Sequence, residues 1–302
     1  NDITSGDANT LVGMRPGEKL TTGYDNTVVG SSALRIATEG YKNVAIGKSS
    51  LENLTTSYHN TAVGFEAGNA ITTGNDNVAV GVQALTSNTT ASENVAIGAY
   101  ALKQNTTGTK NTAIGYYSSH NCSTATNSTS VGYHSLRSLT TGTNNTCVGQ
   151  AAGYTLTTAH NNCFFGNNAG QYLETGNGNV AIGQQAGQNF NGGHVNTAIG
   201  YQAGGSQTSG GTNTFLGGNT GPGSTGTGSN NTYVGYNATP SANNVSNEVT
   251  VGDTSVTKFR IPGLNFSIKD STATDNYVLT VDANGDAGWE AAASGVSSDA
   301  QY

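Results

Sequence analysis

A glycine recurs every 17 residues along most of the chain, each time closing a block of the form N-x-x-[VIL]-G. The spacing holds from Gly13 to Gly217, one extra residue precedes Gly235, and Gly252 follows 17 residues later. A fixed period of this length is typical of solenoids, in which each repeat is a coil that buries its apolar side chains only by stacking on its neighbours. We therefore expect an all-β, parallel β-solenoid of about fifteen coils over residues 1–252.

The composition suits a thin solenoid better than a thick globular core. Only 34% of the residues are hydrophobic, and 43 are glycine. The formal net charge of −7, with only 11 Lys and Arg residues, argues against nucleic-acid binding, which needs clustered cations. No run of about 18 apolar residues occurs, so we expect no membrane insertion. The start at Asn1 and the polar last residues are expected of a piece of a longer protein.

The residue before each repeat glycine is always apolar, and we interpret it as the core of the coil. The residue two positions earlier is Thr or Val, except for Cys163, and residues two apart on a strand share a face. β-branched residues at period two predict a strand, with both positions inward. The predicted structural core, named the pre-glycine column, comprises Val12, Val29, Ile46, Val63, Val80, Ile97, Ile114, Val131, Val148, Phe165, Ile182, Ile199, Leu216, Val234 and Val251.

Between these two positions lies a mostly alanine column, which must point to the opposite face of the strand. An apolar residue on the outside of a thin coil needs a second covering, so we expect the alanine column to pack against another subunit. Larger residues replace alanine in some coils, namely Leu11, Val28, Cys147, Phe164, Phe215 and Tyr233.

An asparagine opens nearly every block and predicts a ladder. Stacked once per coil, side-chain amides can hydrogen-bond to one another along the solenoid. Ser128 and Glu248 interrupt the series. The predicted asparagine ladder comprises Asn9, Asn26, Asn43, Asn60, Asn77, Asn94, Asn111, Asn145, Asn162, Asn179, Asn196, Asn213 and Asn231.

The remainder of each coil predicts a second short strand and two turns. Ala, Ser or Thr stands three residues after most glycines, as at Ala67, and a T-T-G element such as Thr72–Gly74 precedes the next asparagine. The glycine of T-T-G is expected to supply a positive φ. With strands about 4.8 Å apart, the coils would form a rod of roughly 65–70 Å.

The block N-[TSV]-[VA]-[IV]-G-x-x-[AS] resembles the head repeat of YadA-like trimeric autotransporter adhesins. The longer form N-T-A-I-G-Y-Q-A-G, at 196–204, is similar to repeats of phage tail-fibre proteins. The resemblance implies a left-handed β-roll, a homotrimer, and a structural fibre segment of a virion that gives reach and host-surface attachment. A bacterial surface adhesin head, located outside the cell, is the alternative. Further fibre modules and a host-surface glycan or protein are the other implied partners.

Residues 253–302 leave the repeat and predict a small β-rich connector. The stretches at 258–262, 265–269 and 276–281 alternate like strands, and Asn284-Gly285 lies in a turn-forming run before Trp289. Asn-Gly between two β-rich runs is a strong hairpin signal. We therefore expect a hairpin that turns at 282–286.

Patterns for metal, cofactor and catalytic sites are weak, and we expect neither a cofactor nor enzymatic activity. The run from Asp282 begins like a calcium loop but has Ala287 and Ala293 where glycine and glutamate are required. The glycine spacing before Gly47-Lys48-Ser49 is too wide for a phosphate loop. Histidines are expected in exposed turns and cysteines as apolar filler; they are His59, His120, His134, His160, His194, Cys122, Cys147 and Cys163.

Four tyrosines share the position after the repeat glycine and form a candidate exposed aromatic row: Tyr116, Tyr133, Tyr201 and Tyr236. Half-exposed rings can stack on sugars, although packing against the next coil explains the same spacing. The threonine pairs leave ice binding as a minor alternative function. Any recognition is expected where the repeat lapses, in variable turns or beyond the ends.

Overall fold

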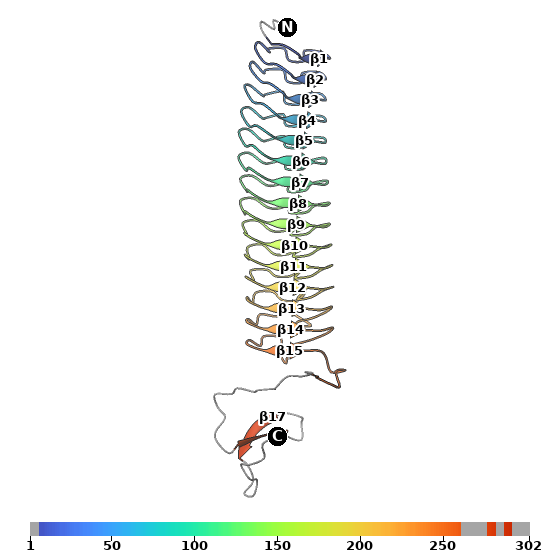
Figure 1. Cartoon of the computed structure of the whole chain (residues 1–302), viewed down its shortest axis with the longest axis vertical. Coiled ribbons are helices and arrows are strands. Elements are labelled where there is room, and N and C mark those ends of the chain that lie inside the picture. The colour runs from blue at the N-terminus through green and yellow to red at the C-terminus, as the bar shows by residue number, and fades with distance from the viewer. Residues whose placement is uncertain (1–5, 261–276, 282–286, 292–302) are drawn as a thin grey trace. The chain divides into compact units, whose positions relative to one another are not determined.

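A computed structural model describes residues 6–260, 277–281 and 287–291 of the chain (Figure 1). The chain divides into two compact units, Asn1–Ser255 and Val256–Tyr302. This boundary is close to the one predicted at 252/253. Within the described ranges, no helix has the length and apolar character needed to cross a membrane.

The first unit is a parallel β-solenoid, as the period predicts. Its strands follow chain order in one 15-stranded sheet and are stacked in sequence in Figure 1. Neighbouring strands pair residues 17 apart, as in Thr112 with Thr129, except that Thr214 pairs with Thr232 across the inserted residue. The strands are β1 (Thr10–Val12), β2 (Thr27–Val29), β3 (Val44–Ile46), β4 (Thr61–Val63), β5 (Val78–Val80), β6 (Val95–Ile97), β7 (Thr112–Ile114), β8 (Thr129–Val131), β9 (Thr146–Val148), β10 (Cys163–Phe165), β11 (Val180–Ile182), β12 (Thr197–Ile199), β13 (Thr214–Leu216), β14 (Thr232–Val234) and β15 (Val249–Val251).

Each described coil has one regular strand instead of the two that we predicted. The rest of the coil consists of turns and bends, although hydrogen bonds to the next coil continue through it, as from Leu102 N to Ser118 O at 3.1 Å. The backbone leaves the extended region at three further points, shown by Tyr117 (φ 56°), Ser119 (φ 47°) and Asn127 (φ 55°). Because the backbone at these residues is in the left-handed region, the chain bends there and cannot form a second strand.

The repeat glycine is required by the corner after each strand. Gly115 has a φ of 132°, and a Cβ there would lie 2.5 Å from the carbonyl oxygen of Gly132 in the next coil. The glycine of T-T-G has a different role from the predicted one. Gly74 does not have a positive φ, but it packs against the carbonyl oxygen of Ala91 in the next coil.

The alanine column lines the interior of the coil, which reverses the predicted faces. Ala96 and Ala113 are fully buried, whereas Ile97 and Ile114 of the pre-glycine column expose 38% and 37% of their surface. The prediction of an inward pre-glycine column and an outward alanine column was therefore wrong for a single chain. Leucines from the other walls, such as Leu102, fill the narrow interior, so the strand wall has room for little more than a methyl group.

Large rings in the alanine column are matched by glycine on a facing wall. Phe164 is fully buried, and a Cβ added at Gly170 would collide with its ring. Phe215 meets Gly204 and Gly221 in the same way, each with a Cβ position 2.7 Å from the ring. Because the facing glycine has no side chain, the larger ring fits, and the interior stays filled without overpacking.

The predicted asparagine ladder is confirmed, and it lies inside the coil. The Oδ1 of Asn162 accepts hydrogen bonds from the backbone N and the Nδ2 of Asn179, at 2.9 and 3.1 Å. The Nδ2 of Asn162 donates to Asn145 Oδ1 at 3.1 Å and to Gly176 O at 2.9 Å. In the interrupted coil, Ser128 Oγ accepts from Asn145 N at a longer 3.3 Å. The amides thus satisfy buried backbone groups at the coil corners.

The second unit contains the predicted hairpin. β16 (Tyr277–Val281) and β17 (Ala287–Ala291) pair antiparallel, with Leu279 opposite Trp289. Residues 258–260 are described and are not in a strand, contrary to part of the prediction for 258–262. The turn predicted at 282–286 and the strand predicted at 265–269 lie outside the described residues.

Candidate functional site

The outer surface of the first unit carries a continuous apolar column. All fifteen pre-glycine residues are exposed or half-buried, and the Thr and Val residues two positions earlier also point outward. Exposure reaches 55% at Val12 in the first coil and is 46% at Leu216. Contiguous apolar surface of this extent is unusual on a monomer and marks an interaction surface.

The predicted aromatic row is exposed but is not a continuous ladder. Tyr116 and Tyr133 lie in neighbouring coils and stack, with ring centroids 5.7 Å apart. Tyr201 and Tyr236 are separated from this pair and from each other by coils with smaller or polar residues at the same position. All four side chains are exposed. The row therefore consists of one stacked pair and two isolated rings.

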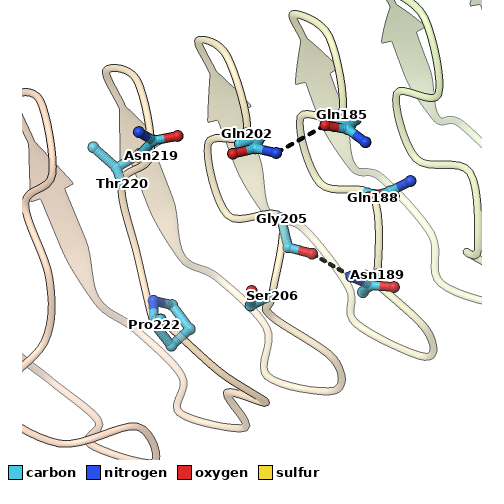
Figure 2. Close-up of a pocket in the computed structure, with 10 residues that line it drawn as sticks. Gln185, Gln188, Asn189, Gln202, Gly205, Ser206, Asn219, Thr220 and Pro222 are labelled. Atoms are coloured by element: carbon cyan, nitrogen blue, oxygen red, sulfur yellow. Dashed lines mark hydrogen bonds between the residues drawn. The ribbon is translucent and has the colours of Figure 1, made fainter.

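A pocket of about 300 Å³ opens on the wall that follows the corner glycine, across the coils of β11, β12 and β13 (Figure 2). Five of its ten lining residues have amide side chains and none is charged. The lining is therefore polar and neutral. It comprises Gln185, Gln188, Asn189, Gln202, Gly205, Ser206, Asn219, Thr220, Pro222 and Gly223.

The pocket exists because long side chains are missing from one column of this wall. The fifth residue after the repeat glycine is Arg137 or Tyr154 in earlier coils, but Gly205 and Pro222 in these coils. The single inserted residue of the repeat falls in the same coil as Pro222. This agrees with the expectation that a recognition feature lies where the repeat lapses, although the sequence did not single out these residues.

Hydrogen bonds between coils hold the amide groups of the pocket. Gln202 Nε2 donates to Gln185 Oε1 at 2.8 Å and Asn189 Nδ2 donates to Gly205 O at 2.5 Å, as Figure 2 shows. Asn219 Oδ1 is buried without a hydrogen-bond partner. Amides donate and accept hydrogen bonds but do not ionise near neutral pH. The pocket is therefore suited to binding hydroxyl-bearing ligands and lacks the groups for acid–base catalysis.

Two of the five histidines, His120 and His134, lie beside the ring of Tyr117. His160 Nδ1 accepts a hydrogen bond from Thr143 N at 3.0 Å. Burial is the main cause that lowers the pKa of His120 and of His134, which favours their neutral form. Among the residues that the structure describes, no group of three or more His, Cys, Asp or Glu side chains could hold a metal ion.

The three cysteines are free, and two of them fill the interior as predicted. Cys122 and Cys147 are buried, whereas Cys163 is partly exposed because it occupies an outward strand position. Burial raises the pKa of Cys122 to about 12. Burial also raises the pKa of Cys147 and of Cys163. The thiolate form that reacts with electrophiles is therefore suppressed at all three.

We expect iodoacetamide at pH 8 to alkylate only Cys163 in the folded protein, and slowly, because the other two thiols are inaccessible. Peptide mass spectrometry after timed quenching measures the three sites separately. Unfolding in guanidinium should make all three react at similar rates. Equal labelling of Cys122 and Cys163 in the folded protein would contradict the buried assignment.

The sequence matches no protein-family model, and it matches no curated protein.

Proposed function

We propose that the chain is a segment of a homotrimeric fibre, of the kind found in phage tail fibres, that provides mechanical reach and host-surface attachment. The observation that supports this proposal is the exposed pre-glycine column, which presents one apolar residue per coil along the first unit. Three chains, each a left-handed coil, would bury these columns around a common axis.

A parallel, in-register assembly suits the geometry of the column. Because every coil presents its apolar residue at the same position, copies that lie side by side in register match like residues at each level. Burying a branched side chain contributes roughly 1.5–3 kcal/mol when it was fully exposed, and less from the half-exposed state seen here. Summed over fifteen coils, these contributions favour assembly.

The pocket and the exposed tyrosines remain usable in such an assembly. Gln185 and Gln202 follow the corner glycines Gly183 and Gly200, whereas the pre-glycine residues precede them. Since the backbone turns at each corner glycine, assembly and recognition use different walls. A fibre built this way holds its binding groups on a rigid scaffold.

The double substitution Ile97→Asp with Ile114→Asp is expected to convert a trimer to single chains, since it places carboxylates in the centre of the proposed interface. Light scattering coupled to size-exclusion chromatography measures the chain number. The unsubstituted protein should have the mass of three chains and should resist denaturing electrophoresis without boiling. A single-chain mass for the unsubstituted protein would refute the trimer.

The matched control is Thr107→Asp with Thr124→Asp, in the same two coils. Both threonines are exposed but lie away from the pre-glycine column. This variant adds the same charge and should stay trimeric. Loss of the trimer in the control as well would show that added charge, and not the column, is responsible.

Two alternatives share parts of this geometry. A bacterial surface adhesin head would use the same assembly, and a coiled-coil stalk with a membrane anchor in the full-length gene would favour it. Ice binding would need free threonine hydroxyls. Thr72 Oγ1 donates to Thr89 O at 3.0 Å and Thr106 Oγ1 to Ser123 O at 3.0 Å, so one threonine row is committed to internal hydrogen bonds.

A further inference from the structure

A cluster of aromatic rings interrupts the polar surface of the first unit on the turns that follow β6 to β9. The rings contact one another across coils, with centroids 5.7 Å apart for Tyr116 and Tyr133, and 5.5 Å apart for Tyr117 and His134. We call Tyr116, Tyr117, His120, Tyr133, His134 and Tyr154 the aromatic patch. Tyr116 and Tyr133 expose 45% and 49% of their surface, so ring area is available to a ligand.

Two basic side chains, Arg137 and Lys103, lie at this patch. The Arg137 guanidinium lies 5.6 Å from the ring centroids of both Tyr117 and Tyr154, and its Nη1 donates to Tyr154 Oη at 2.9 Å. Its Nε is buried and has no hydrogen-bond partner. Lys103 Nζ lies 5.1 Å from the ring centroid of Tyr100, which borders the patch with its own centroid 4.8 Å from that of Tyr117. Neither cation forms an ion pair with any residue that the structure describes.

The surrounding sequence keeps this surface free of negative charge. No aspartate or glutamate occurs between Glu93 and Glu174, although the chain has 18 acidic residues and a net charge of −7. The patch is therefore a locally positive region on an acidic protein. Such a region attracts an anionic ligand that the remainder of the surface repels.

Ring stacking between coils does not by itself explain the patch. Tyr24, Tyr41 and Tyr58 form a plain ladder elsewhere, with near-parallel neighbours 4.9 Å apart and no cation over their rings. In the patch, Tyr117 and His134 of neighbouring coils are inclined at 76°, and the Arg137 guanidinium, which has no ion-pair partner, lies near the rings of both Tyr117 and Tyr154. A ladder needs neither the inclined rings nor the unpaired cation.

We propose that the aromatic patch, with Arg137 and Lys103, binds a carboxylated glycan. Sugar rings would stack on the exposed faces of Tyr116 and Tyr133, and a uronate carboxylate would accept hydrogen bonds from the Arg137 guanidinium. This inference rests on the proposed attachment function and specifies the chemistry of the ligand.

The spacing of the cations favours a glycan over a nucleic acid. Lys103 and Arg137 occupy the same column two coils apart, hence about 10 Å apart along the solenoid. A nucleic-acid strand carries a phosphate about every 3.4 Å in a duplex and needs a denser row of cations. A carboxylated glycan needs to place only one carboxylate at each of the two cations, and its sugar rings can stack on the exposed tyrosine faces.

The test is isothermal titration calorimetry of the full chain with an oligogalacturonate at low salt. Measurable binding is expected, and Arg137→Gln and Tyr133→Ala should each weaken it roughly tenfold or more. The fully methyl-esterified oligogalacturonate, which has the same rings without charge, should bind much more weakly. Absence of binding by the acid form, or equal binding of the ester, would overturn the proposal. Tighter binding of oligothymidylate would overturn it in favour of a nucleic acid.

Matched controls come from the same columns elsewhere on the chain. Arg35 occupies the column of Arg137, but its Nε is paired with Glu52 at 2.8 Å, so Arg35→Gln should leave binding unchanged. Tyr201 occupies the column of Tyr133 outside the patch, and Tyr201→Ala should also have no effect. Equal weakening by the controls would overturn the assignment to the patch.

Light scattering on the same samples separates this inference from the fibre proposal. A trimer that does not bind oligogalacturonate would refute the glycan site and leave the fibre intact. A single chain that binds it in an Arg137-dependent way would support the site and refute the trimer. Circular dichroism of each variant confirms that the solenoid is retained.

Discussion

Replacing Gly115 with alanine is expected to lower the free energy of unfolding by roughly 4 kcal/mol or more, from backbone strain and steric overlap together. The φ of 132° at Gly115 is closed to alanine, and the added Cβ would lie 2.5 Å from Gly132 O. Relief requires the two coils to separate, which would break the hydrogen bonds of β7 to β8. Urea denaturation and hydrogen exchange near β7 measure the global and the local loss.

Gly192→Ala is the matched control for this prediction. Gly192 also has a positive φ, of 77°, but nothing lies within 4 Å of the position of an added Cβ. Its cost should be limited to the left-handed backbone penalty of about 1–2 kcal/mol. If both substitutions lower the free energy of unfolding by the same amount, the close approach between coils does not explain why the corner needs glycine.

Replacing Asn162 with alanine is expected to cost roughly 3 kcal/mol, because it leaves two buried backbone groups without partners. The backbone N of Asn179 loses its acceptor, and Gly176 O loses the amide donor at 2.9 Å. The ladder contact to Asn145 is lost at the same time. The shift of the urea midpoint, with hydrogen exchange at the Asn179 amide, measures the effect.

Two variants test whether the ladder is responsible. Asn167→Ala removes an exposed amide that bonds to Gln150 at 3.1 Å, and it should change stability by less than about 0.5 kcal/mol. Ser128→Asn completes the ladder where it is interrupted and should raise stability by about 1 kcal/mol. A neutral Asn162→Ala, or a destabilising Ser128→Asn, would show that the amides are not a stabilising column.

Several features could be predicted from the sequence because each depends on a single repeated position or on a local signal. The pre-glycine residue and its neighbours predicted the position of each strand, as in β7. The 17-residue spacing predicted the parallel register. The Asn284-Gly285 dipeptide gave the hairpin of β16 and β17. The ladder could be predicted because an asparagine that recurs once per coil lies next to its own copies and can hydrogen-bond to them.

The candidate site could not be predicted in the same way. The pocket is lined by side chains from three coils, and it also depends on the space left by the missing side chain of Gly205. Its sequence signal, the change of spacing before Gly235, marks the coil but not the residues. The aromatic patch likewise joins Arg137 to Tyr117 and His134 to Tyr154, which belong to different columns that become neighbours only after the corners are placed.

The sequence by itself determined the period, the strand positions, the corner glycines and the asparagine ladder. The tertiary structure alone decided which face of the strand is interior. Alternation at period two gives two faces and cannot say which one is enclosed, and the larger apolar residues suggested the wrong one. The interior of a 17-residue coil is narrow and already filled by residues such as Leu102, so it accepts Ala96 and Ala113 and leaves Ile97 and Ile114 outside. The volume inside each coil, which is set by the perimeter of the coil and the left-handed corners that close it, therefore limits the size of the side chains that the strand can turn inward.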